Sequence, residues 1–300
     1  MSRLAVPGRV QGLLWLAVAA VGWGLNWPAT KFALSEWPPF ALRVVSSAGA
    51  VTLLLAIALA RGERIWPRGL AQWGRLTVAG LLNVAPFICL GSLAMLWLDA
   101  SEASIVAYTM PIWAGLLAWP VLGERPTAPR VAGLAVGLGG VGVLLGPLLA
   151  GAESTAALVA KLPGFALILT NAVLFALGTV LTKRRPPGMA PLASLAWQIA
   201  LGSVPVLFGT LLFDRWQGVH IGPGGWLVLL HITFVALCLS YLAWFRALRL
   251  LPASSAAIGT LMVPVIGVVS AGMLLGEPLG WRQIGALGMT MTGVVLASRG

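Results

Sequence analysis

The sequence predicts an all-α membrane protein with ten transmembrane helices, as its composition, its long apolar runs and an internal repeat indicate. Hydrophobic residues make up 59% of the 300-residue chain, charged residues make up 9%, and the mean hydropathy is +0.95. A soluble domain carries about 25% charged residues, so this chain lacks the polar groups that a water-facing surface needs. The composition therefore excludes a soluble domain and, because hydrophobic residues dominate, a disordered chain.

The apolar residues fall into ten segments, separated by charged residues, proline and glycine. A helix needs about 20 apolar residues to cross a bilayer, and each segment is close to that length. The first segment continues through Asn26 and Pro28 to Lys31, which makes it longer than the core of a signal peptide. The predicted spans are 11–32, 38–60, 73–97, 102–122, 129–149, 163–183, 190–213, 225–247, 253–275 and 280–298.

The distribution of basic residues predicts that both termini face the cytoplasm. The chain has a net charge of +11, but its 19 Lys and Arg residues stand singly or in small groups between apolar runs. This pattern is typical of membrane topology and not of nucleic-acid binding, so the expected partner is the lipid bilayer and no nucleic acid. With the N-terminus inside, the basic residues in the outer loops are only Lys31, Lys161, Arg215 and Arg282.

The second half of the chain repeats the first. A shift of 152 residues places Thr30-Lys31 on Thr182-Lys183, and a shift of 153 places Leu122-Gly123-Glu124 on Leu275-Gly276-Glu277. Residues 1–150 and 151–300 are therefore predicted to be two five-helix repeats. Because five is odd, the second repeat would be inverted in the membrane, an arrangement typical of transporters that open alternately to each side.

Three sequence features occur together in a known family. They are the run Trp23-Gly24-Leu25-Asn26, the pair Pro38-Pro39 followed by Arg43, and the doubled blocks from proline to Leu-Gly-Glu. In this respect the chain resembles the drug/metabolite transporter superfamily over nearly all its length. Within that superfamily it looks like the ten-span EamA-type exporters, and most like the aromatic amino-acid exporter group.

The resemblance implies a bacterial inner-membrane exporter of small molecules, namely amino acids with aromatic or apolar side chains. It also implies that the two repeats surround a central cavity and that the fifth and tenth spans lie at the periphery. Alternating access around that cavity would then carry the substrate across.

Polar amides within spans are costly, so each is a candidate for binding the polar end of a substrate. An amide can donate to a carboxylate and can accept from an ammonium group. The alternative is that these amides only bridge neighbouring helices. The candidates are Asn26, Asn83, Asn171 and Gln198.

Aromatic and large apolar residues away from the span ends are candidates for binding a flat side chain. The alternative for each of them is ordinary packing or lipid contact. The candidates are Trp23, Tyr108, Trp113, Trp197, Tyr241 and Met262, and Trp27 also lies deep in its span.

Four prolines within spans are candidates for shaping the cavity or its gates. Pro111 and Pro264 occupy matching positions of the two repeats, and Pro28 and Pro86 lie in the first and third spans. A proline removes a backbone hydrogen bond, and interrupted helices at corresponding positions indicate a binding site. The alternative is a purely structural kink.

Three charged residues are predicted to be structural. Arg43 lies near the outer end of the second span, where its side chain can reach the surface, and the family resemblance implies an ion pair there, near the outer gate. Glu124 and Glu277 follow the fourth and ninth spans, where they are expected to cap the next helix and to pair with nearby arginines.

The absence of several motifs and residue types excludes some classes of function. No P-loop, HExxH or GxSxG motif occurs, so no enzyme activity and no nucleotide-driven transport are expected. Cys89 and Cys238 lack metal-binding spacing, and no metal or cofactor is expected. No Asp or Glu lies at mid-depth, which favours facilitative transport. Proton-coupled drug or metabolite efflux, with His231 as a relay, remains an alternative, as does a non-transporting scaffold of the same fold.

The glycines of the fifth span have spacings that let helices approach closely. They predict packing within a monomer, or a weak homodimer. These glycines are Gly133, Gly137, Gly142 and Gly146.

Overall fold

The computed structural model describes residues 6–125, 127–150, 155–251 and 259–298, and over these residues it is built of helices and their connections. The first five predicted spans correspond to α1 (Val6–Ala33), α2 (Pro39–Ala60), α3 (Gly69–Ala79) with η1 (Gly80–Val84) and α4 (Ala85–Ala94), α5 (Ala100–Ala107) with α6 (Met110–Leu122), and α7 (Ala128–Ala150).

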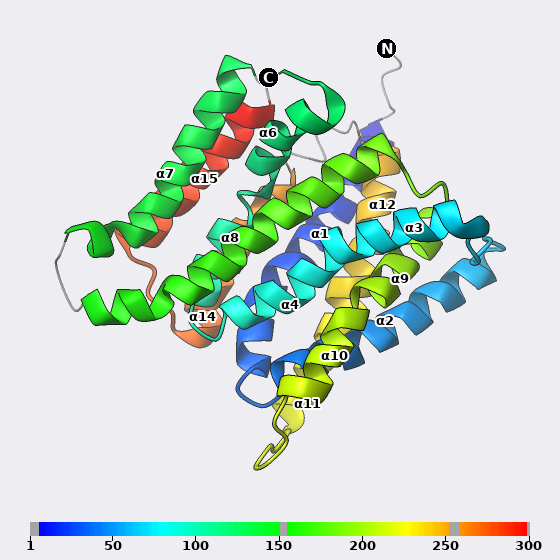
Figure 1. Ribbon diagram of the computed structural model, residues 1–300, viewed down its shortest axis with the longest axis horizontal. Helices are drawn as coiled ribbons and strands as arrows, with labels where there is room; N and C mark the ends of the chain where they lie inside the picture. The colour runs from blue at the N-terminus through cyan, green and yellow to red at the C-terminus, as the bar shows by residue number, and fades with distance from the viewer. Residues whose placement is uncertain (1–5, 126, 151–154, 252–258, 299–300) are drawn as a thin grey trace.

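The second half follows the same order of elements (Figure 1). Its spans are α8 (Thr155–Arg184), α9 (Pro191–Gly202) with α10 (Val204–Phe213), α11 (Pro223–Leu230) with η2 (His231–Leu239) and α12 (Ser240–Leu250), α14 (Met262–Leu275), and α15 (Trp281–Ser298). The all-α membrane fold predicted from the sequence is thereby confirmed. Eight helical segments among the described residues are long and apolar enough to cross a bilayer. Of the other two spans, α14 is shorter and α15 is less apolar.

Two of the predicted spans contain an irregularity that the sequence pattern did not indicate. The third and eighth spans change to π-helix over η1 and η2. A shift of 153 carries residues 80–84 of η1 onto 233–237, which lie inside η2. Both segments are apolar throughout, so the sequence offers no periodicity that distinguishes a π-helical turn from an α-helical one.

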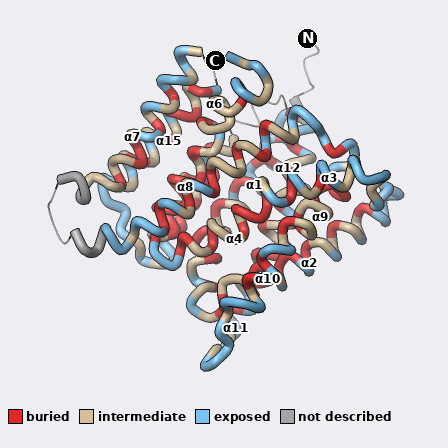
Figure 2. Tube along the Cα trace, viewed as in Figure 1, coloured by how far each residue is buried: buried red, intermediate tan, exposed pale blue. Residues whose placement is uncertain are grey.

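The helices pack in corresponding pairs. In one group α1 packs against α12 and α14, and in the other α8 packs against α4 and α6. Helix α2 packs against α9, and α5 contacts α14 near the centre of the molecule. Buried residues concentrate where these helices face one another, as the red segments of α1, α4, α8 and α9 in Figure 2 show.

Helices α7 and α15 pack together at one edge of the molecule, on the left in Figure 1. Their backbones approach closely because Gly133 and Gly293 face each other. A Cβ atom on Gly133 would lie 2.5 Å from the carbonyl oxygen of Gly293. The peripheral position expected for the fifth and tenth spans is the one that the structure has.

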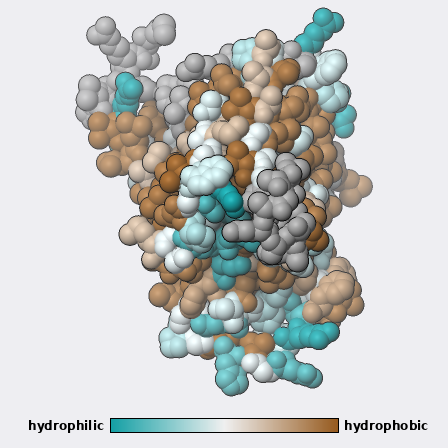
Figure 3. Space-filling model, turned by 90° about the vertical axis from the view of Figure 1, so that its left-hand side faces the viewer, coloured by the Kyte–Doolittle hydropathy of each residue, from teal (hydrophilic) through white to brown (hydrophobic). Residues whose placement is uncertain are grey.

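The surface has the character expected of a protein in lipid. Large apolar side chains are exposed along several helices, among them Leu211 and Leu212 at 73% each. Figure 3, which views the molecule from the left-hand side of Figure 1, shows hydrophobic residues over much of this face. Hydrophilic residues gather in a central strip and at the lower edge.

Candidate functional site

Two helices break near the centre of the molecule, at corresponding positions of the two halves. Helix α5 ends at Ala107 and α6 begins at Met110, so that Tyr108 and Thr109 form a turn just before Pro111. In the second half, Leu261 forms a turn immediately before α14, whose first turn contains Pro264. These breaks leave irregular backbone within the bundle, and discontinuous helices of this sort form substrate sites in many membrane transporters.

The other two prolines behave differently from each other. Pro28 lies inside α1, which continues through it to Ala33. Pro86 lies in the first turn of α4, directly after the π-helical segment η1. Pro86 therefore marks a change of helix type, whereas Pro28 does not end its helix.

Aromatic rings from both halves meet around these breaks, and we call them the ring cluster: Trp23, Trp27, Phe87, Tyr108, Phe175 and Tyr241. The rings of Trp23 and Tyr241 stand edge to face, 5.1 Å apart, and the Trp23 Nε1 donates to the carbonyl of Ala236 at 3.1 Å. The Tyr108 and Tyr241 phenols are close enough to interact electrostatically.

The remaining rings come from α1, α4 and α8. Phe87 lies 5.8 Å from Trp27 and 6.2 Å from Phe175. The shift of 152 residues carries Trp23 onto Phe175. Each of these two residues contacts an aromatic ring of the helix that packs beside it, Tyr241 on α12 for Trp23 and Phe87 on α4 for Phe175.

Three amides near the ring cluster keep polar atoms without a hydrogen-bond partner. Asn171 is fully buried, and neither its Nδ2 nor its Oδ1 has a partner among the described residues. It lies one turn before Phe175 on α8. The Oδ1 atoms of Asn26 and Asn83 are also buried and unpaired in this part of the chain, although the Asn83 Nδ2 donates to Thr182 at 3.4 Å. A buried polar atom without a hydrogen-bond partner destabilises the fold. A bound polar molecule that supplied the missing hydrogen bonds would remove this cost.

Four predicted site residues lie outside the ring cluster. Trp197 packs with Trp66 and Trp73 and donates from Nε1 to the carbonyl of Ile65 at 2.6 Å. Gln198 bonds to Ser194 on its own helix, and Met262 is 49% exposed. Trp113 donates from Nε1 to the Thr109 hydroxyl at 3.2 Å, which fixes it beside the break between α5 and α6.

Arg43 is buried without a carboxylate. Its side chain is 4% exposed, its Nε donates to the Ser92 hydroxyl at 2.6 Å, and its Nη2 donates to the Thr30 hydroxyl at 2.9 Å. No ion pair of Arg43 occurs among the residues that the structure describes, so the expected ion pair is not observed there. Thr30 follows Trp27 by about one helical turn, and Ser92 follows Phe87 by five residues. The guanidinium therefore lies just beyond the ring cluster, toward the end where α2 begins.

The two glutamates that follow the matching Leu-Gly pairs have different partners. Glu277 accepts hydrogen bonds from the backbone N–H groups of Ala100, at 2.7 Å, and Ser101, at 2.9 Å, so it caps α5 across the bundle instead of pairing with Arg282. Glu124 pairs with Lys183 at 2.8 Å and with Arg130 at 3.6 Å. The hydrogen bond from Lys183 lowers the pKa of the Glu124 carboxyl.

Two lysines bind residues at the end of the bundle that holds Glu277. From the sequence, they were counted only as charges of the outer loops. Lys31 donates to the carbonyls of Met95, at 2.6 Å, and Leu98, at 2.8 Å. Lys161 pairs with Asp99 at 3.0 Å and with Glu102 at 2.8 Å. The match of Thr30-Lys31 to Thr182-Lys183 in the repeat was the signal that could have singled out Lys31.

Comparisons with known proteins match both halves of the chain to one family. The model of the EamA-like transporter family matches residues 10–146 and again residues 162–299. The chain is 28% identical to the uncharacterized transporter YvbV of Bacillus subtilis, with 95% of this chain and 90% of that protein covered. It is 30% identical to a probable amino-acid metabolite efflux pump of Escherichia coli, with 96% and 94% covered.

A solved crystal structure shares the fold, with a TM-score of 0.66, 21% identity, and 95% of this chain and 96% of that chain covered. The double match of the family model also divides the chain close to its midpoint. The family and the names of the relatives indicate a multi-pass membrane transporter of small molecules and not an enzyme. This chain belongs to the EamA-like transporter family.

Proposed function

We propose that this transporter exports amino acids with aromatic or apolar side chains by facilitated, alternating access. The observation that carries the proposal is the position of Arg43, a buried cation without a carboxylate, beside the ring cluster. The relatives from Escherichia coli and Salmonella typhimurium, which are named as probable amino-acid metabolite efflux pumps, agree with this class of substrate.

Each part of an amino acid would find a matching group. Arg43 would bind the carboxylate, because a guanidinium donates to carboxylates with strong, directional hydrogen bonds. The unpaired Asn171 Oδ1 would accept from the ammonium group. The rings of Trp23, Phe175 and Tyr241 would contact a flat side chain edge-on or offset, as aromatic pairs prefer.

We also propose that residues 1–150 and 151–300 are inverted repeats that exchange conformations during transport. The corresponding pairings of α1 and α8, the matched helix breaks and the matched π-helical segments support this division. The two ends of the bundle differ in this structure. Glu277 and Lys31 bind backbone groups around α5, whereas their counterparts Glu124 and Lys183 bind each other. In this proposal the Glu277 end is the closed outer gate.

Loss of the Glu277 carboxylate should open the outer gate. Glu277→Ala removes two hydrogen bonds to the start of α5, which should shift the equilibrium toward the outward-open state by about tenfold or more. In a cysteine-free background, a membrane-impermeant thiol reagent added outside should label a cysteine at the buried Ser104 faster by that factor.

Glu36→Ala is the matched control for this experiment. Its carboxylate likewise accepts from two backbone N–H groups, those of Gly222 and Gly225, but these belong to the start of α11 and not of α5. We expect no change in the labelling rate for this variant. Equal rates for Glu277→Ala and the parent would contradict the assignment of the gate.

We propose facilitative transport because no acidic residue belongs to the ring cluster. The ring cluster and the three amides near it include no acidic side chain, and His231 is not one of the cluster residues: it lies half-buried on η2, with its Nε2 unpaired among the described residues. Proton coupling normally uses an ionisable group at the binding site. We therefore propose that the amino-acid gradient alone drives export.

The proposed membrane topology places both termini in the cytoplasm of the bacterial cell, with the protein in the inner membrane. Cysteines introduced at Ser2 and Gly300 should then resist membrane-impermeant thiol reagents in intact cells and react after the membrane is opened. Labelling of either terminus in intact cells would overturn this topology. The close packing of Gly133 within the monomer supports a monomer as the transporting unit.

Transport selectivity tests the proposed substrate class. Phe175→Ala and Tyr241→Ala should weaken transport of phenylalanine and tryptophan by about tenfold, because each removes ring contact and apolar burial, and should change alanine transport little. Phe213→Ala is the control, since Phe213 is 70% exposed on α10. A parallel loss for alanine and phenylalanine in well-folded variants would show that the rings do not contact the substrate side chain.

A further inference from the structure

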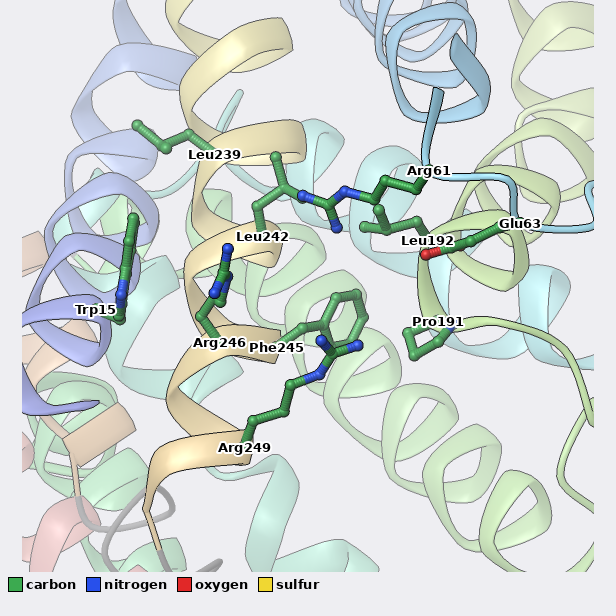
Figure 4. A pocket seen from close by; sticks show the side chains of 10 residues that line it. All are labelled: Trp15, Arg61, Glu63, Pro191, Leu192, Leu239, Leu242, Phe245, Arg246 and Arg249. Atoms are coloured by element: carbon green, nitrogen blue, oxygen red, sulfur yellow. The ribbon is translucent and has the colours of Figure 1, made fainter. Parts of the chain in front are cut away.

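A cavity separate from the ring cluster lies at the end of the bundle where α2 and α12 end. Its volume is about 170 Å³, and its walls come from α1, the residues after α2, the start of α9, the end of η2, and α12. Arg61, Arg246 and Arg249 line it together with Glu63 and Trp15 (Figure 4). The residues of the ring cluster do not line this cavity, so it is distinct from the proposed substrate site.

The local fold brings these charges together from two elements. Helix α2 ends at Ala60, and Gly62 takes a left-handed conformation with φ of 69°. The N–H of Glu63 then bonds to the carbonyl of Ala58 at 2.9 Å, which fixes Arg61 and Glu63 on either side of the turn. Arg246 and Arg249 are three residues apart and share one face of α12.

All three guanidinium groups are unpaired in the described part of the chain. None of them has a side-chain hydrogen bond or an ion pair there, and the Oε2 of Glu63 is buried without a hydrogen-bond partner. Three cations thus face one carboxylate around one space. Such a space suits an anion with several acceptor oxygens that also carries a hydrogen-bond donor for Glu63.

The wall of the cavity changes from apolar to cationic from the end of η2 along α12. Leu239 of η2 and Leu242 of α12 line its apolar part, and Leu239 precedes Arg249 by ten residues, or about 15 Å of helix. Trp15 faces the cavity from α1, and tryptophan is typical of the membrane interface. This order matches a lipid that lies along the helix, with its chains beside the leucines and its phosphate among the arginines.

We propose that this cavity binds the headgroup of phosphatidylglycerol from the leaflet at that end of the bundle. The phosphate accepts from Arg61, Arg246 and Arg249, and a glycerol hydroxyl donates to Glu63. The acyl chains lie against Leu239 and Leu242. This lipid site is independent of the transported substrate, and it requires only that the bundle sits in a bilayer.

Lipid binding to the purified protein tests the proposal. Native mass spectrometry and thermal unfolding in detergent should both detect dioleoylphosphatidylglycerol and show weaker binding of dioleoylphosphatidylcholine. Each arginine at an anionic lipid is worth about fivefold in affinity, so the double variant R246Q/R249Q should bind phosphatidylglycerol about 25-fold more weakly.

The matched control is R184Q/R185Q. Both arginines lie at the same end of the bundle and are exposed, and they do not line the cavity. This double variant should bind phosphatidylglycerol as the parent does. Equal losses in the two double variants, or no loss in either, would overturn the site.

Inorganic phosphate separates a lipid from a soluble ligand. At millimolar concentration it should leave the unfolding temperature of the parent unchanged, because it lacks the apolar contacts with Leu239 and Leu242. If inorganic phosphate stabilises the parent as much as phosphatidylglycerol does, and R246Q/R249Q removes that effect, the cavity is a site for soluble phosphate and the lipid proposal is wrong.

Discussion

Replacement of Arg43 by Gln should remove most amino-acid transport without lowering the stability of the protein. A substrate carboxylate that enters the site would lose its cation and remain buried and unpaired, which costs about 3 kcal/mol or more, or roughly a hundredfold in apparent affinity. The empty protein would lose a buried charge that no described carboxylate neutralises. Removing such a charge should leave the unfolding temperature unchanged or higher.

The outcome separates a substrate-binding role from a structural one. Transport of phenylalanine and of phenethylamine, which lacks the carboxylate, should be measured side by side in liposomes. Arg43→Gln should reduce only the transport of phenylalanine, and Arg43→Lys, which keeps the charge, should retain part of it. A structural Arg43 would instead give a lower unfolding temperature and an equal loss for both compounds.

Replacement of Gly133 by Leu should strongly destabilise the pair of α7 and α15. A Cβ at this position would lie 2.5 Å from the Gly293 carbonyl oxygen and 2.8 Å from the Ala297 nitrogen, and these backbone atoms cannot rotate away. Overpacking of this kind costs about 1–3 kcal/mol and should lower the unfolding temperature in detergent by several degrees.

Gly142→Leu on the same helix is the control for Gly133→Leu. No atom lies within 4 Å of a Cβ at Gly142, so the side chain would extend into open space. We expect an unfolding temperature close to that of the parent. If Gly142→Leu destabilises the protein and Gly133→Leu does not, the glycines of α7 face a second copy of the chain and not α15.

The ten-span architecture could be predicted because long apolar runs and their breakers report directly on membrane spans. The π-helical segments η1 and η2 could not, because an apolar run such as residues 231–239 gives no signal of its hydrogen-bonding pattern. The broken helices before Pro111 and Pro264 could be predicted, since proline removes a backbone hydrogen bond wherever it stands in a helix.

The site was only partly predictable, because depth within a span says nothing about which way a side chain faces. Trp23 and Trp197 both lie deep in their spans, yet only Trp23 belongs to the ring cluster. Phe87 and Phe175 escaped notice because a phenylalanine in an apolar run is unremarkable. The repeat could have found Phe175, which corresponds to Trp23. Glu277 needed the structure, since its partners lie 176 and 177 residues away.

The most direct test of the account is counterflow of labelled phenylalanine in liposomes that contain only the purified protein. With unlabelled phenylalanine inside and no pH gradient, membrane potential or nucleotide, the parent should accumulate label transiently, and external tryptophan should compete better than alanine. Arg43→Gln should show little accumulation. Label that enters only when a pH gradient is imposed, or that no aromatic amino acid displaces, would contradict facilitated export of aromatic amino acids.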